Sequence, residues 1–228
     1  MAQLIKDISK RVRAIKPDIL IEFRQPYNGP VGCGAANMMR VNDCPNDALF
    51  NRLGSVELRL LTGKTAVHSD MIGWNNDDTP QGCARQLVGV LFSVPQISVK
   101  LEEQREDQLK TLKFYMDFYM ENRETLLDGK IIPLNPEANY SVVIGEKDNK
   151  AVVVCYSKNY VKLTKKYDSL SIVNGTEEDI IILNNDGEAY EREITIYDCM
   201  GNALEKKSIT VNNGLNAFNI PPCGLIKI

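Results

Sequence analysis

Histidine and paired cysteines are scarce in this sequence of 228 residues. It holds one histidine, His68, and six scattered cysteines that form no Cys-x-x-Cys pair. Structural zinc sites and disulfide-rich domains need closely spaced cysteine and histidine residues or a dense cysteine framework. We therefore expect no metal site, and we expect most cysteines to be small buried side chains. Gly29, Gly32 and Gly34 do not form the dinucleotide fingerprint that opens a helix directly after a strand, so no cofactor is expected.

Long hydrophobic runs and an excess of charge of one sign are absent as well. The longest apolar stretches fall well short of the roughly 18 residues that cross a bilayer. Thirty acidic against 27 basic residues give a net charge of −3, which lacks the basic footprint of a nucleic-acid binder. The N-terminal residues have apolar side chains at helical spacing in place of a signal-peptide core. We expect neither membrane nor nucleic acid as a partner, and the cytoplasm is the default location.

The first 130 residues alternate between strand and helix patterns. Short apolar runs predict strands at 19–23, 37–41, 65–71 and 95–101, and helices are predicted before Pro17 and at 44–61, 83–92 and 104–129. The run at 19–23 is almost entirely apolar, which is typical of a strand covered on both faces. Strands that alternate with helices indicate an α/β domain of four βα units with parallel strands.

From Lys130 onward the sequence changes to β-branched and aromatic runs separated by turn-forming segments such as EKDNK, NNDGE and NNG. This pattern predicts an antiparallel β domain without catalytic groups. The fold class is therefore α/β followed by all-β, with domains at 1–130 and 131–228.

Acidic side chains follow the ends of three predicted strands. Glu22 ends the first strand, Asp70 ends the third, and Asp43 and Asp47 follow the second. The carboxyl ends of parallel strands open on one face of a sheet or barrel, so we expect these acids to converge there. The same segments also supply cationic and aromatic side chains, namely Arg24, Tyr27, Arg40, His68 and Trp74. Paired acids beside a cation and an aromatic surface are typical of proteins that bind and cleave sugars.

Structural roles are open for several of these residues. Asp43 or Asp47 could cap the helix that begins near Ala48. His68 taken alone is more often a structural histidine than a catalyst. Trp74 differs, because it stands in a polar loop next to Asn-Asn-Asp-Asp and has little core to enter.

Four segments resemble, in this order, the second half of the catalytic barrel of the α-galactosidase (melibiase) clan of glycoside hydrolases. They read IEFRQPYNGP, MMRVNDCPNDALFNRL, AVHSDMIGW and FYMENRETLLDGKIIPL. The resemblance covers about residues 15–135 in pattern. It implies a partial TIM-type β/α barrel, strands five to eight, followed by a C-terminal antiparallel β-sandwich.

The resemblance also implies a role for individual residues. Asp43 matches the general acid/base of that clan. The sugar-contacting positions match Glu22 at the end of strand five, Arg40 on strand six, and Asp70 with Met71 in the turn after strand seven. Asp47 and Arg52 match the second aspartate and the arginine of the strand-six signature, and Arg24, His68 and Trp74 are expected to line the same sugar subsite.

The nucleophilic aspartate of the clan has no counterpart in this sequence. A retaining glycosidase needs two carboxyl groups about 5–5.5 Å apart. We therefore expect a C-terminal portion of a retaining α-galactosidase-type hydrolase that is inactive alone, or a half-barrel that needs a partner. The partner would be a second copy or the missing N-terminal barrel half, and the substrate an oligosaccharide or glycoside. The alternative is a non-catalytic carbohydrate-binding or assembly module.

Overall fold

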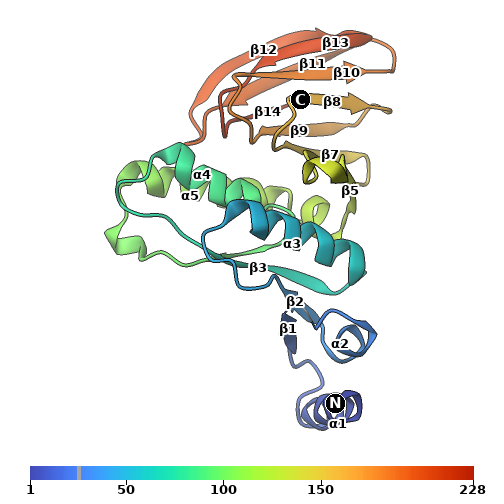
Figure 1. Ribbon diagram of the computed structural model, residues 1–228. Coiled ribbons are helices and arrows are strands. Elements are labelled where there is room, and N and C mark those ends of the chain that lie inside the picture. Colours follow the sequence, from blue (N-terminus) through green and yellow to red (C-terminus); the bar gives the residue numbers. More distant parts are fainter. Residues whose placement is uncertain (25–26) are drawn as a thin grey trace. The chain divides into compact units, whose positions relative to one another are not determined.

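The computed structural model describes residues 1–24 and 27–228 of the chain (Figure 1). Packing divides it into two compact units. The first unit comprises Met1–Gly73 and Val90–Ser98, and the second comprises Trp74–Gly89 and Val99–Ile228.

The first unit is built on a parallel sheet in which the strands are adjacent in chain order. The order is β1 (Glu22–Arg24), β2 (Met38–Arg40), β3 (Ala66–Ile72) and β4 (Val94–Ile97), and each neighbouring pair is parallel. The helices of this unit are α1 (Ala2–Ile15), α2 (Pro30–Ala35) and α3 (Ala48–Leu61). The predicted alternation of helices with parallel strands is thus confirmed.

One face of this sheet is apolar and covered by helix. Met39 of β2 and Val67 of β3 are buried and pack with Leu58 of α3 in one hydrophobic cluster. Side chains alternate between the two faces of a strand, so Arg40, next to Met39, points away from this cluster. The sheet therefore has a core face and a polar face.

Two features of the first unit differ from the sequence prediction. The strand predicted at 19–23 begins only at Glu22, and Leu20 before it is 70% exposed. β1 is not covered on both faces, because Glu22 and Arg24 are exposed and Phe23 is only partly buried. Helix α2 was not predicted, since its short sequence PVGCGA has no amphipathic period.

The second unit contains helices α4 (Pro80–Gly89) and α5 (Glu106–Glu121), with the 3₁₀ turns η1 (Leu101–Glu103) and η3 (Pro136–Ala138). The helix predicted at 104–129 is interrupted after Glu121, and a π-helical turn, η2 (Glu124–Asp128), follows it. Gly129 ends this turn where a Cβ atom would lie 2.3 Å from the Thr125 carbonyl oxygen. Only a glycine fits that approach without a shift of the backbone.

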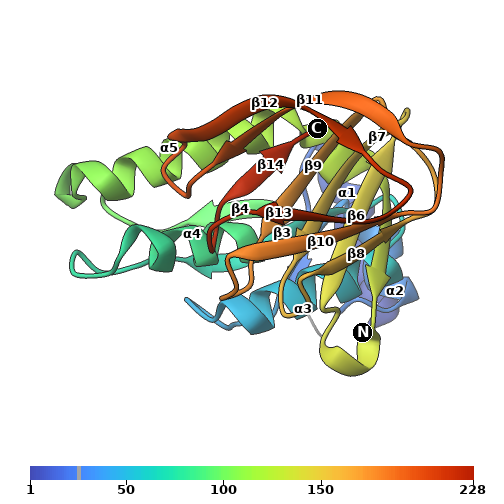
Figure 2. The same ribbon diagram turned by 90° about the horizontal axis from the view of Figure 1, so that it is seen from above.

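Two further sheets complete the second unit (Figure 2). The strands are β5 (Lys130–Leu134), β6 (Val142–Lys147), β7 (Lys150–Cys155), β8 (Tyr160–Leu163), β9 (Ser169–Asn174), β10 (Ile180–Asn185), β11 (Tyr190–Tyr197), β12 (Ala203–Val211), β13 (Gly214–Asn219) and β14 (Leu225–Lys227). The larger sheet has the order β12-β11-β14-β9-β7-β6-β5, and the smaller one has the order β13-β10-β8. The pairing is mainly antiparallel as predicted, but β7 with β9 and β8 with β10 are parallel pairs.

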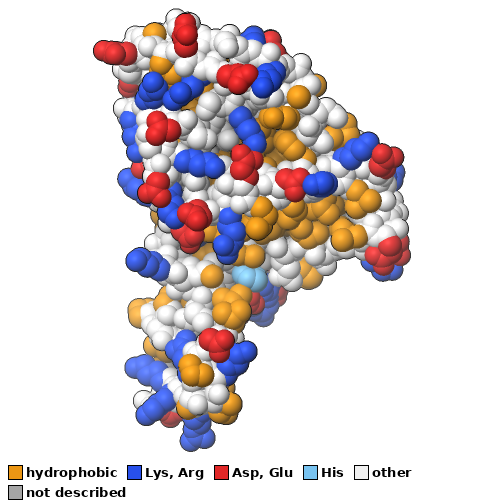
Figure 3. Space-filling model, turned by 180° about the vertical axis from the view of Figure 1, so that it is seen from behind, with side chains coloured by type: hydrophobic (Ala, Val, Ile, Leu, Met, Phe, Trp, Pro, Cys, Tyr) orange, Lys and Arg blue, Asp and Glu red, His pale blue; other side chains and the backbone are white. Residues whose placement is uncertain are grey.

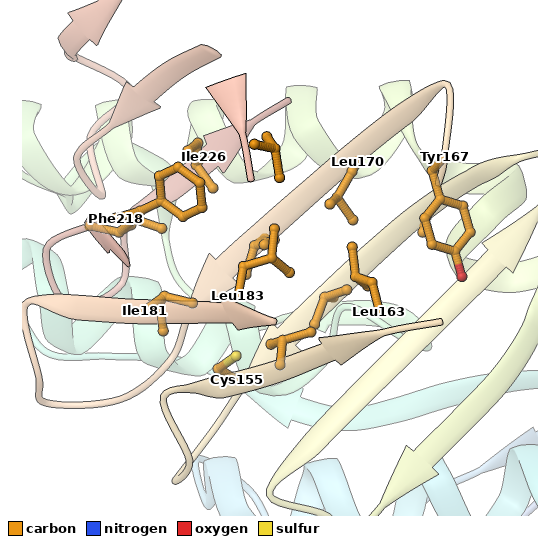
Figure 4. Close-up of a cluster of buried hydrophobic side chains, with 14 of the residues drawn as sticks. Cys155, Leu163, Tyr167, Leu170, Ile181, Leu183, Phe218 and Ile226 are labelled. Atoms are coloured by element: carbon orange, nitrogen blue, oxygen red, sulfur yellow. The ribbon is translucent and has the colours of Figure 1, made fainter. Parts of the chain in front are cut away.

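Both sheets contribute to one hydrophobic core (Figure 4). Leu183 and Ile181 of β10 and Phe218 of β13 lie in the same cluster as Leu170 of β9 and Ile226 of β14. Packing also places α4 and α5 in the unit that holds these strands. The predicted change to β structure is found at Lys130, while the domain boundary at 130/131 stays a prediction.

The surface carries both signs of charge. Lysine, arginine and acidic side chains are intermixed across the face drawn in Figure 3. Within the part of the chain that the structure describes, no helix is long and apolar enough to cross a membrane.

The shared core gives a test of stability. Leu183 is fully buried in it, whereas Leu215 on β13 is 69% exposed. We expect Leu183→Ala to lower the free energy of unfolding by about 2–5 kcal/mol, because the cavity removes packing contacts as well as buried area. The matched substitution Leu215→Ala is expected to cost under about 1 kcal/mol. Urea unfolding of the two variants measures both values, and equal losses would contradict the assignment of this core.

Candidate functional site

The register of the parallel sheet of the first unit brings two arginines and the single histidine to one level. Arg24 of β1 pairs with Arg40 of β2, and Arg40 pairs with His68 of β3. Residues in register on parallel strands point to the same side, so the three side chains lie on the polar face. Two guanidinium groups at neighbouring positions repel each other, and this arrangement requires acidic partners.

Arg40 contacts all three of the acids around it. Its Nη1 lies 2.5 Å from Asp70 Oδ1, its Nη2 lies 3.1 Å from Asp43 Oδ1, and its Nε lies 3.7 Å from Glu22 Oε1. The Arg40 side chain is only 19% exposed. Three of the four acids that were expected to converge therefore meet at one guanidinium group, while Asp47 does not, and Glu22 lies at the start of β1 instead of its end.

Asp70 is the buried member of this cluster. Its side chain is 1% exposed, and its Oδ2 accepts a hydrogen bond from the Cys44 backbone N–H at 2.6 Å. Its own backbone N–H donates to Asn51 Oδ1 at 2.7 Å. A buried carboxylate is stable only when it is paired and hydrogen-bonded, and Arg40 with Cys44 provides both. Asp70 is consequently fixed in position.

Asp43 is the exposed member. It forms ion pairs with Arg24 and Arg40 while its side chain remains 59% exposed. The hydrogen bond from Arg24, followed by the one from Arg40, lowers the pKa of Asp43 from the ordinary value of 3.8. At neutral pH this group is a carboxylate. The acid/base role that the resemblance implies stays a prediction, because a proton donor needs a raised pKa.

Glu22 connects the cluster to the histidine. Its Oε1 faces Arg40 Nε, and its Oε2 lies 3.5 Å from His68 Nδ1. Both side chains are partly exposed, at 37% for Glu22 and 25% for His68. We call the set Glu22, Arg24, Arg40, Asp43, His68 and Asp70 the Arg40 cluster.

The remaining predicted residues lie outside these contacts. Asp47 caps α3, since its Oδ1 accepts from the Phe50 N–H at 2.9 Å. Met71 contributes a backbone carbonyl that accepts from Asn46 N–H at 3.0 Å, which fastens the 43–47 loop to β3. Trp74 belongs to the second unit and donates its Nε1–H to Gln104 Oε1 at 2.7 Å. The sugar-binding roles of these three residues stay predictions.

Sequence reasoning missed Asn51. This side chain is fully buried on α3 and holds the backbone of Asp70. The sequence could have indicated this role, because Asn51 is a polar residue four positions after the Asp47 cap and lies on the face of α3 that carries the buried residues. The partner, Asp70, follows 19 residues later, and a contact of that range has no local pattern.

The cluster offers hydrogen-bond donors and acceptors side by side on a partly open surface. Ionised carboxylates accept, guanidinium groups donate, and a neutral imidazole can do either. Such planar, charged groups suit the paired hydroxyl groups of a sugar. Among the described residues no group of three or more histidine, cysteine or acidic side chains is arranged to hold a metal ion. The cysteines are free thiols, and four of the six are buried.

Comparison with known proteins gives structural matches alone. No protein-family model matches the chain, and no curated protein matches it. Its structure is similar to the galactosidase domain of alpha-galactosidase-sucrose kinase, AgaSK, with a TM-score of 0.55 and 11% identity. That match covers 97% of this chain and 30% of the other.

Two further matches have TM-scores below 0.5 and carry no argument. N2152 from Neocallimastix frontalis matches with a TM-score of 0.41 and 10% identity over 100% of this chain and 64% of that one. A glucosidase from Croceicoccus marinus matches with a TM-score of 0.44 and 8% identity, over 99% of this chain and 63% of that one. The chain thus spans 30% of the galactosidase domain's length and shares its fold over that part.

The lowered pKa of Asp43 gives a test of the cluster. Since its folded-state pKa lies below the ordinary value, Asp43 stabilises the fold above that ordinary value and loses this contribution as pH falls through the folded-state pKa. We expect carbon-13 NMR to give Asp43 a titration midpoint below 3.8, and Arg24→Gln to move it upward. Arg11→Gln, on the exposed side of α1, is the control. A midpoint above 3.8 in the unaltered chain would show that the ion pairs do not form.

Proposed function

We propose that this chain is part of a glycoside hydrolase of the α-galactosidase type, a retaining enzyme that removes terminal α-linked sugars. In this proposal the first unit is the second half of a TIM-type barrel, and the strands of the second unit form the C-terminal β-sandwich. The observation that carries it is the convergence on Arg40 of three acids, Glu22 at the start of β1, Asp43 in the loop after β2 and Asp70 within β3. The fold shared with a galactosidase domain supports the same proposal.

The Arg40 cluster would bind the glycosyl group. Arg40 and Asp70 are held rigidly, because Asp70 is buried and has a second hydrogen bond from the Cys44 N–H. A preorganised pair of this kind binds hydroxyl groups at little ordering cost. Glu22, His68 and Arg24 are partly exposed and complete the surface that meets the sugar.

Asp43 is the proposed acid/base. Its pKa must rise before it can donate a proton, because the hydrogen bonds from Arg24 and Arg40 lower it. A glycoside that displaces Arg24 from Asp43 would remove the hydrogen bond that contributes most to the lowered pKa of Asp43. The pKa would then rise, Asp43 could take up a proton from solvent, and it could pass that proton to the leaving oxygen. The proton would return when water attacks the glycosyl intermediate.

The nucleophile is proposed to come from a partner. Asp70 and Glu22 both face Arg40, and Asp70 is buried, so neither offers a free carboxylate to an anomeric carbon. A closed barrel has eight strands, whereas β1 and β4 are open edges of a parallel sheet of four. A second copy or an N-terminal barrel half would cover these edges and bring the missing carboxylate.

A non-catalytic sugar-binding module is the second candidate. One observation favours it, namely that Asp43 is held as a carboxylate by two arginines. Hydrolysis of p-nitrophenyl α-galactoside, by the chain alone or with its partner, would support the enzyme. Binding without turnover even in the presence of the partner would support the module.

Calorimetric titration with methyl α-galactoside tests the binding site. We expect Arg40→Gln to weaken binding at least about tenfold, because it removes a charged donor worth about 1.5–3 kcal/mol. Arg24→Gln is a second test variant, which is also expected to weaken binding. It can be measured even if Arg40→Gln unfolds, because the Arg24–Asp43 pair is exposed. Arg11→Gln serves as the matched control. Unchanged affinity in both cluster variants would place the sugar elsewhere.

The catalytic assignment is tested in a preparation of the whole enzyme that hydrolyses glycosides. Asp43→Asn is expected to cost about 10²–10⁴-fold with a poor leaving group and less with an activated aryl glycoside, because only the former needs a proton. Equal losses on the two substrates would rule out Asp43 as the proton donor.

A further inference from the structure

The smaller sheet of the second unit, with the strand order β13-β10-β8, has one face in the core and one face outside it. Ile181 and Leu183 of β10 and Phe218 of β13 are buried in the core that the two sheets share (Figure 4). Successive residues of a strand point to opposite faces, so the sequence neighbours of these residues lie on the other face. The residues of that face are at least partly exposed in all three strands.

The pairing register sets these outward residues side by side. Ala217 of β13 pairs with Ile182 of β10, which in turn pairs with Tyr160 of β8. The neighbouring row, across the same three strands, consists of Leu215, Asn184 and Lys162. We call these two rows the outer face.

The outer face is more apolar than the solvent side of a sheet usually is. Leu215 is 69% exposed and Tyr160 is 39% exposed, and Ala217 and Ile182 complete the row of Tyr160. Solvent-facing sides of antiparallel sheets normally carry polar side chains. The edge strand of the larger sheet, β12, follows this rule, because its lysines form ion pairs with glutamates. Exposed apolar residues that lie next to one another are a sign of a binding surface.

Polar groups on the outer face are fixed beside the aromatic ring. Asn184 donates its Nδ2–H to the Tyr160 hydroxyl oxygen at 2.9 Å, which holds the amide and the phenol together. Asn184 Oδ1 accepts no hydrogen bond from the described residues, and the Tyr160 O–H remains able to donate. Lys162 pairs with Asp186 at 2.9 Å, so the outer face carries no uncompensated charge.

The outer face is small. It crosses three strands of 4 to 6 residues, which corresponds to a flat area of at most about 10 Å by 20 Å. A stable protein–protein contact buries about 800 Å² on each partner. The outer face is therefore too small to hold a protein partner by itself, and its size suits a short segment of a sugar chain.

We propose that the outer face is a second carbohydrate-binding surface, which takes a neutral polysaccharide with Tyr160 as the stacking residue and Asn184 as the hydrogen-bonding residue. The C–H groups on the face of a sugar ring pack against an aromatic ring, and the hydroxyl groups bond with amides. A neutral ligand fits a surface whose lysine is already paired. The choice of a sugar rests on the proposed function, but this surface lies within the second unit and shares no residue with the Arg40 cluster.

Affinity gel electrophoresis of the full chain tests this surface. The probe is a soluble galactomannan, a neutral polysaccharide with terminal α-galactosyl groups. Every protein in the series carries Arg24→Gln, which is expected to weaken binding at the Arg40 cluster, so that retardation reports on the outer face. We expect Tyr160→Ala to raise the dissociation constant about tenfold and Leu215→Ala about threefold, because both remove apolar contact area.

Two further variants complete the series. Tyr160→Phe keeps the ring and is expected to stay within about twofold of the parent. Leu204→Ala is the matched control, because Leu204 lies on β12, away from the outer face, and is 57% exposed. It is expected to leave retardation unchanged.

Equal retardation of the parent, Tyr160→Ala and Leu215→Ala would overturn the inference, and so would the absence of retardation in the parent. Self-association of the parent in light scattering that both substitutions abolish would also overturn it, because the outer face would then be a contact between copies. The proposed function is tested separately by calorimetry with methyl α-galactoside, so either idea can fail while the other stands.

Discussion

The like charges of Arg24 and Arg40, side by side on neighbouring strands, set the constraint on which the candidate site depends. Strands lie about 4.8 Å apart, and two guanidinium groups at that spacing would repel by about 3 kcal/mol at an effective dielectric constant of about 20. Acidic side chains from three different segments form ion pairs with the two arginines and offset this repulsion. Glu22 precedes Arg24 on the same strand, Asp43 follows β2, and Asp70 lies on β3.

This arrangement divides the acids by their exposure. Asp70 is buried, has two hydrogen-bond partners, and fixes the loop after β2 through the Cys44 N–H. Asp43 faces solvent and pairs with the side chains of Arg24 and Arg40. In the proposed function, a ligand could replace Arg24 at Asp43 without breaking the pair of Arg40 with Asp70. In the proposed function, this asymmetry lets one cluster hold a rigid binding group beside a group whose pKa changes when Arg24 is displaced.

The sequence carried part of this picture. Alternating strand and helix patterns predicted the parallel sheet, because periodicity is a local signal, and the acids at strand ends predicted the convergence. The pattern left open whether Asp47 caps a helix, and the bond to Phe50 N–H shows that it does. The predicted coverage of β1 on both faces was wrong, because its two charged residues, Glu22 and Arg24, are exposed and enter the ion pairs of the cluster. Asn51 acts through a contact 19 residues away, which no local pattern encodes.

The central claim is that a sugar binds at the Arg40 cluster. Mapping of amide and arginine side-chain NMR signals during a titration with methyl α-galactoside tests it most directly. The account predicts that the largest shifts belong to the Cys44 amide, which reports on Asp70, and to the guanidinium signals of Arg24 and Arg40. Shifts confined to residues outside the Arg40 cluster would contradict it.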